Sequence, residues 1–371
     1  MASPQAVRFC PDPGMQRIRT KQSRGMASWP DSVSQSQESP IKKQGGKRVI
    51  DSGLRIGVLT SGGDAPGMNA AIRAVVRAGA HFNVRVFGIS GGYEGIFKGD
   101  IDEMHADDVT NIIHRGGTVL RTARCMEMMT EEGQLRASEV LKVMKLDALV
   151  VIGGDGSFRG ARALARHGIG VVGIPATIDL DINCTEYTIG FDTAVNTAAD
   201  AIMRIRDTSS SHERCSVVEV MGRDAGYLAL WCGLAAGAEE VLVPEQPLKT
   251  EAVIEQILRN RARGKKHNLV VVAEGIGGSD ELAKDIGRIL SIEARATVLG
   301  HLQRGGTPTA VDRMHATMMG FLAVKAIHGG EVNRVVVFKN GKYELLELNE
   351  ALNAKKAYTD EMYEIIKILA I

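Results

Sequence analysis

Several features that would define a class of protein are absent from this 371-residue sequence. The formal net charge is only +1, which gives no general electrostatic basis for binding nucleic acid or an anionic membrane. No apolar run approaches the roughly 18 residues that a membrane span requires. We therefore expect neither nucleic acid nor a membrane among its partners.

Cysteine is scarce and lacks the spacing of a metal or disulfide site. The sequence has 5 cysteines, an odd number, and no C-x-x-C arrangement. This pattern disfavours a disulfide framework and a zinc site, and it favours a reducing compartment. We expect a cytoplasmic protein.

Two common nucleotide-binding motifs are also missing. The sequence has no G-x-x-x-x-G-K-[ST], and no G-x-G-x-x-G follows a predicted strand. A Walker-type site and a dinucleotide fingerprint are therefore excluded.

The first part of the chain differs in composition from the rest. Residues 1–51 are rich in Ser, Gln, Pro, Lys and Arg and show little apolar periodicity, which is typical of disorder. We expect a disordered or non-native N-terminal extension. A transit peptide is the alternative, although Asp12 and Asp31 interrupt the segment and no amphipathic helix is evident.

From about residue 54, predicted strands and helices alternate. Strands are expected at 55–60, 84–89, 148–157 with its turn, 171–174, 216–222, 240–244, 268–274, 296–300 and 335–338, the last in a hairpin that turns at Asn340-Gly341. Helices are expected at 70–79, 106–115, 192–206, 225–236, 250–262, 280–290, 309–327 and 355–369. This alternation predicts an α/β fold with mainly parallel sheets.

Glycine-rich turns follow several predicted elements, at Gly62–Asp64, Gly116–Thr118 and Gly153–Ser157. Glycine lets backbone N–H groups approach phosphate oxygens, and a helix that starts there favours an anion. Asp155 in the last turn suits a magnesium ion on a nucleotide phosphate. A tight turn without function is the alternative for each.

The segment Ile174–Asp181 ends a predicted buried strand and carries Thr177, Asp179 and Asp181. If the backbone stays extended, the two aspartates point the same way because strand side chains alternate. Two carboxylates at a strand end suit a general base beside a metal-phosphate. Solvated acids in a loop are the alternative.

Basic side chains follow later predicted strands. Arginine beside glycine suits bidentate capture of phosphate, whereas surface salt bridges are the alternative. Glu274, at a strand end, suits sugar hydroxyls or a helix cap. These basic positions are Arg214, Arg223, Arg295, His301 and Arg304.

In combination, these motifs resemble the bacterial-type ATP-dependent 6-phosphofructokinase family, from about residue 54 to 371. The matching stretches are G-V-L-T-S-G-G-D-A-P-G-M-N-A-A-I-R, V-I-G-G-D-G-S, P-A-T-I-D-L-D, D-T-S-S-S-H-E-R, V-E-V-M-G-R-D-A-G and L-G-H-L-Q-R-G-G. The resemblance implies phosphorylation of fructose 6-phosphate at O1, the committed step of glycolysis, with ATP as co-substrate and Mg²⁺ as cofactor.

The resemblance also implies roles for single residues. Asp179 would be the general base, with Thr177 beside it, Asp181 positioning magnesium or tuning the base, and Arg223 polarising the phosphoryl group. The nucleotide site would comprise Gly63, Tyr93, Arg124, Cys125, Gly154, Asp155, Gly156 and Ser157, with Asp155 towards the metal. Fructose 6-phosphate would be held by Thr177, Asp179, Met221, Gly222, Arg223, Glu274, His301 and Arg304, and by Arg214 and Arg295 of a neighbouring subunit in a homotetramer.

The implied architecture has two three-layer α/β domains with the active site in the cleft between them. The nucleotide-binding domain would be 52–190 plus 303–353, and the sugar-phosphate domain 191–302 plus 354–371. Relatives that use pyrophosphate carry an aspartate and a lysine where this chain has Gly156 and Ala176. These small residues leave room for ATP.

The chain departs from the family pattern at three positions. Leu180 replaces a common asparagine, Arg121 a usual glycine, and Ala106 an arginine of the implied allosteric anion site. The rest of that site would be Arg73, Arg77, Arg206, Glu239, Arg263, Lys265 and His267. Regulation by ADP or phosphoenolpyruvate stays open, as do two rival functions: a pyrophosphate-dependent kinase and a catalytically weak regulatory paralogue.

Overall fold

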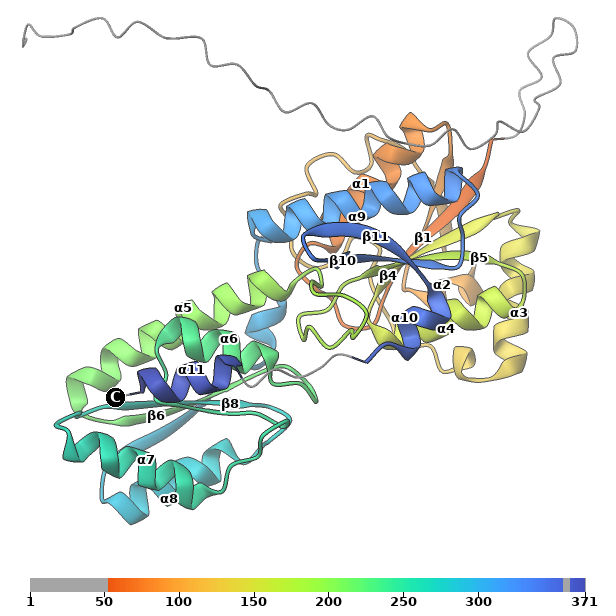
Figure 1. Cartoon of the computed structure of the whole chain (residues 1–371). Helices are drawn as coiled ribbons and strands as arrows, with labels where there is room; N and C mark the ends of the chain where they lie inside the picture. The colour runs from red at the N-terminus through yellow and green to blue at the C-terminus, as the bar shows by residue number, and fades with distance from the viewer. Residues whose placement is uncertain (1–52, 356–360, 371) are drawn as a thin grey trace, which may run out of the picture. The chain divides into compact units, whose positions relative to one another are not determined.

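The computed structural model describes residues 53–355 and 361–370. The predicted N-terminal extension, residues 1–51, lies outside them. The described chain forms two β-sheets, each covered by helices on both faces (Figure 1).

The larger sheet has seven strands in the order β11-β10-β5-β4-β1-β2-β3. Its five inner strands run parallel, and the outer strands β3 and β11 are antiparallel to their neighbours. The strands are β1 (Arg55–Ser61), β2 (Arg85–Ile89), β3 (Ile101–Met104), β4 (Ala148–Gly153), β5 (Gly170–Pro175), β10 (Arg334–Lys339) and β11 (Lys342–Glu347). β1, β4 and β5 are almost fully buried, and their carboxyl ends lie together because they are parallel.

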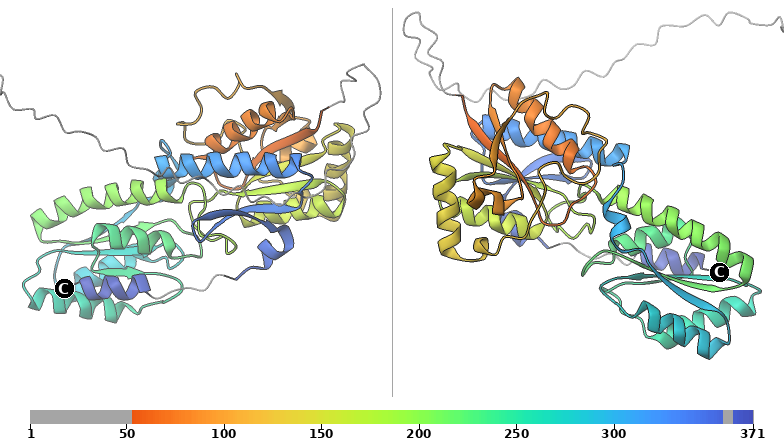
Figure 2. Two further views of the ribbon diagram at one scale, coloured as in Figure 1. Left: turned by 45° about the horizontal axis from the view of Figure 1, so that its top comes forward. Right: turned by 180° about the vertical axis from the view of Figure 1, so that it is seen from behind.

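Two layers of helices cover this sheet. On one face α1 (Met68–His81) packs along α9 (Ala310–His328), and the other face carries α2 (Tyr93–Lys98), α3 (Glu131–Val143), α4 (Asp155–Arg166) and α10 (Leu348–Asn353). Figure 2 shows α1 and α9 together on the same side of the sheet. Each face has its own cluster of buried apolar side chains.

The smaller sheet is entirely parallel, in the order β7-β8-β6-β9. Its strands are β6 (Cys215–Val220), β7 (Glu240–Leu242), β8 (Asn268–Ala273) and β9 (Ala294–Val298). One face carries α5 (Phe191–His212), α6 (Tyr227–Ala236) and α11 (Glu361–Leu369), and the other α7 (Thr250–Ala262) and α8 (Ser279–Leu290). No helix within the described ranges is both long and apolar enough to cross a membrane.

The predicted α/β class and most predicted elements are confirmed, and α7 matches its predicted bounds. The helix predicted at 106–115 is wrong, because this segment consists of turns. The Asp108 carboxylate accepts a hydrogen bond from the His105 N–H, a local bond that competes with helix formation. Asn111 has φ 61°, in the left-handed region that interrupts a helix.

The sequence did not predict β3, α2, α3 or α10. β3, α2 and α3 are short or weakly patterned, although Thr130 caps α3 by accepting a hydrogen bond from the Gly133 N–H at 3.1 Å. The helix predicted at 355–369 is confirmed as α11 over Glu361–Leu369. Residues 356–360, in the first part of the predicted helix, lie outside the described part of the chain.

Candidate active site

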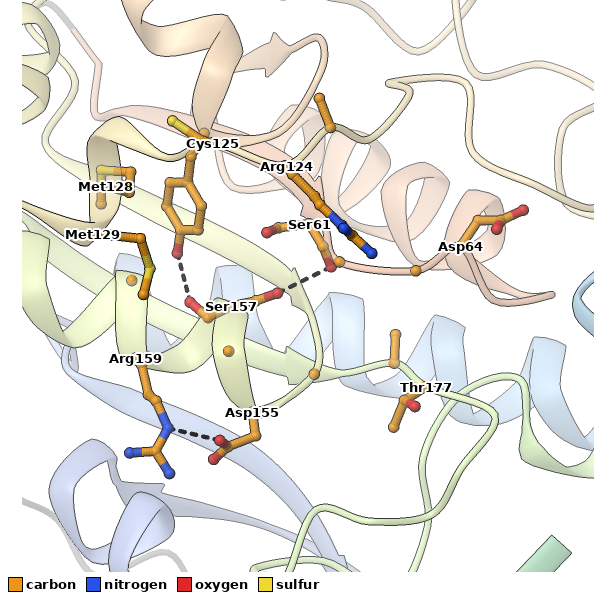
Figure 3. Close-up of a pocket in the computed structure, with 18 of the residues that line it drawn as sticks. Ser61, Asp64, Arg124, Cys125, Met128, Met129, Asp155, Ser157, Arg159 and Thr177 are labelled. Carbon is orange, nitrogen blue, oxygen red and sulfur yellow. Dashed lines mark hydrogen bonds and ion pairs between the residues drawn. The ribbon is translucent and has the colours of Figure 1, made fainter. Parts of the chain in front are cut away.

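One cavity of about 990 Å³ collects most of the predicted site residues (Figure 3). Its walls include the turns that follow β1, β4 and β5, together with residues that follow β6 and β8. The predicted residues that line it are Gly63, Tyr93, Arg124, Cys125, Gly154, Asp155, Gly156, Ser157, Thr177, Asp179, Asp181, Arg223, Glu274, His301 and Arg304.

Ser157 joins the glycine turns after β1 and β4. Its hydroxyl donates to the Ser61 carbonyl oxygen at 3.0 Å, and its own carbonyl accepts from the Tyr93 hydroxyl at 2.6 Å. Burial raises the pKa of Tyr93, so this phenol stays a neutral donor. The hydrogen bonds hold the two turns at one edge of the sheet, where their N–H groups are available to an anion.

Arg304 lies against the first glycine turn. Its Nη1 donates to the Asp64 carbonyl oxygen at 3.2 Å, and a Cβ on Gly63 would lie only 2.1 Å from the same nitrogen. A side chain at position 63 would therefore force the end of the Arg304 side chain to move away from this turn. Burial raises the pKa of Asp179, and the guanidinium so placed opposes this rise because it favours the ionised carboxylate.

Asp179 is a buried carboxylate on the cavity wall, with only 6% of its surface exposed. Its Oδ2 accepts from the Thr177 hydroxyl at 3.2 Å, whereas its buried Oδ1 has no hydrogen-bond partner among the described residues. Burial, followed by repulsion from Asp181, raises its pKa from 3.8 to about 6. A carboxylate on the cavity wall with a raised pKa suits a general base that accepts a proton from a bound hydroxyl.

Asp181 follows Asp179 through a left-handed turn. β5 ends at Pro175 and Leu180 has φ 54°, so the extended conformation considered from the sequence is wrong. Both acids nevertheless line the cavity. Arg223 Nη1 lies 3.9 Å from Asp181 Oδ2, and burial raises the pKa of Asp181 although Arg223 opposes the shift.

Glu274 fixes the backbone that presents Arg223. Its Oε1 accepts from the N–H of Arg223 at 2.6 Å and from that of Gly222 at 3.3 Å. Arg223 has φ 57° and its side chain is 68% exposed, so the loop directs the guanidinium outward, towards the cavity. Met221 and Gly222 do not line the cavity themselves.

Arg214 and Arg295 are the predicted cationic substrate residues that do not line this cavity. Both form ion pairs with Glu293 instead, and Arg295 Nε lies 2.8 Å from Glu293 Oε1. Arg214 immediately precedes β6, and Arg295 lies on β9, the edge strand of the smaller sheet, where it is in register with Ser216.

The predicted allosteric residues fall into two groups. Arg73 and Arg77 lie one turn apart on α1, where burial and then repulsion from Arg77 lower the pKa of Arg73. In the second group, two side chains contact the segment just before β7: Arg206 donates to the carbonyl oxygens of residues 236 and 237, and Lys265 Nζ lies 2.8 Å from Glu239 Oε1. Arg263 immediately follows α7, and the buried Nε2 of His267 has no hydrogen bond within the part of the chain that the structure describes.

The sequence reasoning missed several residues of the cavity wall. Three methionines, Met126, Met128 and Met129, line it beside Cys125. Three arginines project from one face of α4, at Arg159, Arg162 and Arg166. Their spacing of three and four residues after a glycine turn was a readable signal, because such positions share one helix face.

A metal ion here would need ligands from the substrate. Within residues 53–355 and 361–370, no cluster of three or more His, Cys, Asp or Glu side chains is arranged to hold one. Asp155 and Asp181 line the same cavity and are near enough that Asp155 raises the pKa of Asp181. Two such carboxylates fit Mg²⁺, which binds one or two carboxylates and completes its shell with water and phosphate oxygens.

These features define a phosphoryl-transfer site: an acid that can serve as a base, glycine turns for phosphates and cationic side chains around them. Residues 55–327 match the family described as Phosphofructokinase, and the chain belongs to this family. It is 53% identical to an ATP-dependent 6-phosphofructokinase of Clostridium botulinum over 315 residues, which is 85% of this chain and 99% of the relative. The identity, length and coverage are the same for one of Clostridium novyi.

Solved structures show the same fold. A phosphofructokinase from Saccharomyces cerevisiae matches with a TM-score of 0.76 and 35% identity over 86% of this chain, and this chain covers about half, 48%, of the yeast chain. A pyrophosphate-dependent phosphofructokinase from Nitrosospira multiformis matches with a TM-score of 0.76 at 20% identity, over 85% of this chain and 91% of that one. At that identity the likeness extends to the fold alone.

Proposed function

We propose that this chain catalyses the ATP-dependent phosphorylation of fructose 6-phosphate at O1, giving fructose 1,6-bisphosphate and ADP in glycolysis. The observation that carries the proposal is Asp179. Its buried Oδ1 has no hydrogen-bond partner in residues 53–355 and 361–370, its pKa is raised to about 6, and it lines the same cavity as the G-G-D-G-S turn. The 53% identity to ATP-dependent 6-phosphofructokinases supports the same reaction.

In this reaction Asp179 takes the proton of the sugar hydroxyl, and Thr177 orients the carboxylate through its hydrogen bond. Arg223 stabilises charge on the transferred phosphoryl group, and Asp181 holds Arg223 or the metal. Most of the acceleration then comes from positioning and electrostatics, as phosphoryl transfer requires.

The remaining cavity residues divide between the two substrates. Glu274, His301 and Arg304, with Met221 and Gly222 behind them, hold the sugar phosphate. The nucleotide site comprises Gly63, Tyr93, Arg124, Cys125, Gly154, Asp155, Gly156 and Ser157. Mg²⁺, held by Asp155 and Asp181, would neutralise phosphate charge when bound.

Two small residues favour ATP over pyrophosphate as the donor. A Cβ on Gly156 would meet nothing within 4 Å, so the space beside this position is open. Ala176 lines the cavity with a side chain of a single carbon. An aspartate at 156 would repel the α-phosphate, and a lysine at 176 would occupy its volume.

We further propose a cytoplasmic homotetramer in which Arg214 and Arg295 reach the site of a neighbouring subunit. The nucleotide domain would comprise 52–190 and 303–353, and the sugar-phosphate domain 191–302 and 354–371. An allosteric anion site would use the residues around Glu239 with Arg73 and Arg77.

Steady-state kinetics with ATP and with pyrophosphate, with fructose 6-phosphate varied and ADP present or absent, tests donor, acceptor and regulation together. Turnover with ATP is expected. Product with pyrophosphate and none with ATP would overturn the proposal. A negligible rate with either donor, unchanged by Asp179→Ala, would instead identify a regulatory paralogue without catalytic activity.

A further inference from the structure

Four charged side chains form a wall shared by two cavities. Asp155, Arg159, Asp181 and Arg223 line both the main cavity and a second cavity of about 210 Å³, which α10 helps to close. We propose that Arg159 is a phosphate-binding residue that is held by Asp155 until a magnesium-bound nucleotide enters, and then exchanges this carboxylate for a nucleotide phosphate. The inference rests on the proposed position of the nucleotide.

The two acids of this wall each face one arginine. Arg159 Nε lies 2.7 Å from Asp155 Oδ2, and Arg223 Nη1 lies 3.9 Å from Asp181 Oδ2. Figure 3 shows the Arg159 guanidinium turned to Asp155, one helical turn back along α4. Asp155, the acid expected to bind the metal, is therefore paired with Arg159 of the same helix.

This pair is easily broken. The side chains of Arg159 and Asp155 are 58% and 40% exposed, and solvent screens such a pair on a helix surface. A phosphate offers the guanidinium a bidentate partner of higher charge, with stronger hydrogen bonds. Magnesium offers the carboxylate a stronger cation in return.

The surroundings of Arg159 suit its movement towards phosphate. Arg162 and Arg166 continue the same basic face of α4 along the cavity, and Arg124 lies on another part of the wall. The second cavity leaves space on the other side of the pair. A released Arg159 would therefore join a cationic surface rather than enter an apolar one.

Calorimetric titration with ATP in EDTA, without fructose 6-phosphate, separates Arg159 from catalysis. Asp155→Asn should release Arg159 and tighten metal-free ATP binding by about tenfold, the change that one charge-assisted hydrogen bond gives. Adding Arg159→Met should abolish this gain. Adding Arg204→Met instead is the matched control, because Arg204 Nε lies 2.8 Å from Asp200 Oδ2 in the same i,i+4 geometry on α5, and the gain should remain.

Two results would overturn the exchange: no tighter binding in Asp155→Asn, or a gain that persists after Arg159→Met. Gly156→Asp checks the nucleotide position separately. If ATP still binds to that variant as to the unaltered chain, the proposed nucleotide site itself fails. If Gly156→Asp abolishes binding while Asp155→Asn has no effect, only the role of Arg159 fails.

Discussion

Asp179 is a residue whose burial weakens the fold and serves the proposed chemistry. Its pKa in the folded chain, about 6, is above the 3.8 of an exposed aspartate. The folded state therefore binds this proton more tightly than the unfolded state. This tighter proton binding adds at most about 3 kcal/mol to the free energy of unfolding. The contribution is fully present below pH 3.8 and is lost as the pH rises through about 6.

Asp179→Asn tests both consequences. At pH 8 the free energy of unfolding should rise by about 1–3 kcal/mol, because a neutral amide avoids the cost of a buried charge. In the same variant kcat should fall by roughly a thousandfold, the usual loss of a general base. Urea unfolding at pH 8 and pH 4, with kinetics at pH 8, measures both. A stability gain of equal size at both pH values would contradict the charge argument.

The hydroxyl of Thr177 should affect the pH profile of the reaction. It donates to Asp179 Oδ2 at 3.2 Å and so lowers the pKa of that carboxyl. The acidic limb of kcat/KM is expected near pH 6, and Thr177→Val should move it to higher pH. Thr177→Ser, which keeps the hydroxyl, is the control. A limb that is the same in all three proteins would exclude Asp179 as its source.

Leu180 has a backbone conformation that destabilises the fold and a buried side chain that stabilises it. Its φ of 54° costs about 1 kcal/mol for a residue other than glycine or asparagine. Its side chain, however, is 5% exposed within the apolar core, which contributes roughly 2 kcal/mol. Leu180→Asn should therefore lower the unfolding free energy by about 1 kcal/mol in urea titrations and leave both acids active. A more stable variant would show that the backbone cost dominates.

At the scale of elements, one buried acid connects the loop after β5 to two helices. Asp312, at the start of α9, is fully buried and accepts from the Tyr187 hydroxyl at 2.6 Å, the Gly190 N–H at 2.7 Å and the Thr193 N–H at 2.8 Å. Gly190 immediately precedes α5. The same loop closes on itself, because the Thr188 hydroxyl donates to the Thr177 carbonyl at 2.8 Å.

Replacing Asp312 with asparagine should affect stability more than removing one of its donors. Asp312→Asn turns an amide NH₂ towards N–H groups, and we expect a loss of about 3 kcal/mol. Tyr187→Phe removes a single donor and should cost about 1 kcal/mol. Urea unfolding of both variants measures the difference. Equal losses would show that Asp312 depends on Tyr187 alone.

At the scale of the whole molecule, the question is whether the active site of one chain needs Arg214 and Arg295 from a neighbouring chain. Neither lines the cavity of its own chain. Arg295 lies on the edge strand of the smaller sheet, and Arg214 forms an ion pair with the same Glu293 as Arg295. If a neighbouring chain supplies them, Asp179→Asn and Arg295→Ala chains should each be inactive alone. They should regain activity when unfolded and refolded together, in an assay with fructose 6-phosphate.

In such a hybrid, one site combines an intact Asp179 with an intact Arg295 from the other chain. A mixture of Asp179→Asn and Asp179→Ala chains is the control and should stay inactive. Hybrids without activity would show that each site is built from a single chain.

The sequence by itself determined the α/β alternation and the chemistry-bearing turns. Apolar strands followed by glycine or acid, as in Gly153–Ser157, are local patterns that require no knowledge of distant residues. The glycine turn before α1, the acids after β5 and the arginines at 223 and 304 were all located in this way, and all line the cavity.

Only the tertiary structure decided how these residues meet. Leu180 turns into the left-handed region because its side chain finds a buried apolar site, which no local pattern predicts. The pairing of Arg159 with Asp155, the approach of Arg304 to Gly63, and the separation of Arg214 and Arg295 from the cavity likewise depend on distances in space. The pKa of Asp179 follows from the same cause, since burial and neighbouring charge are properties of the packed chain.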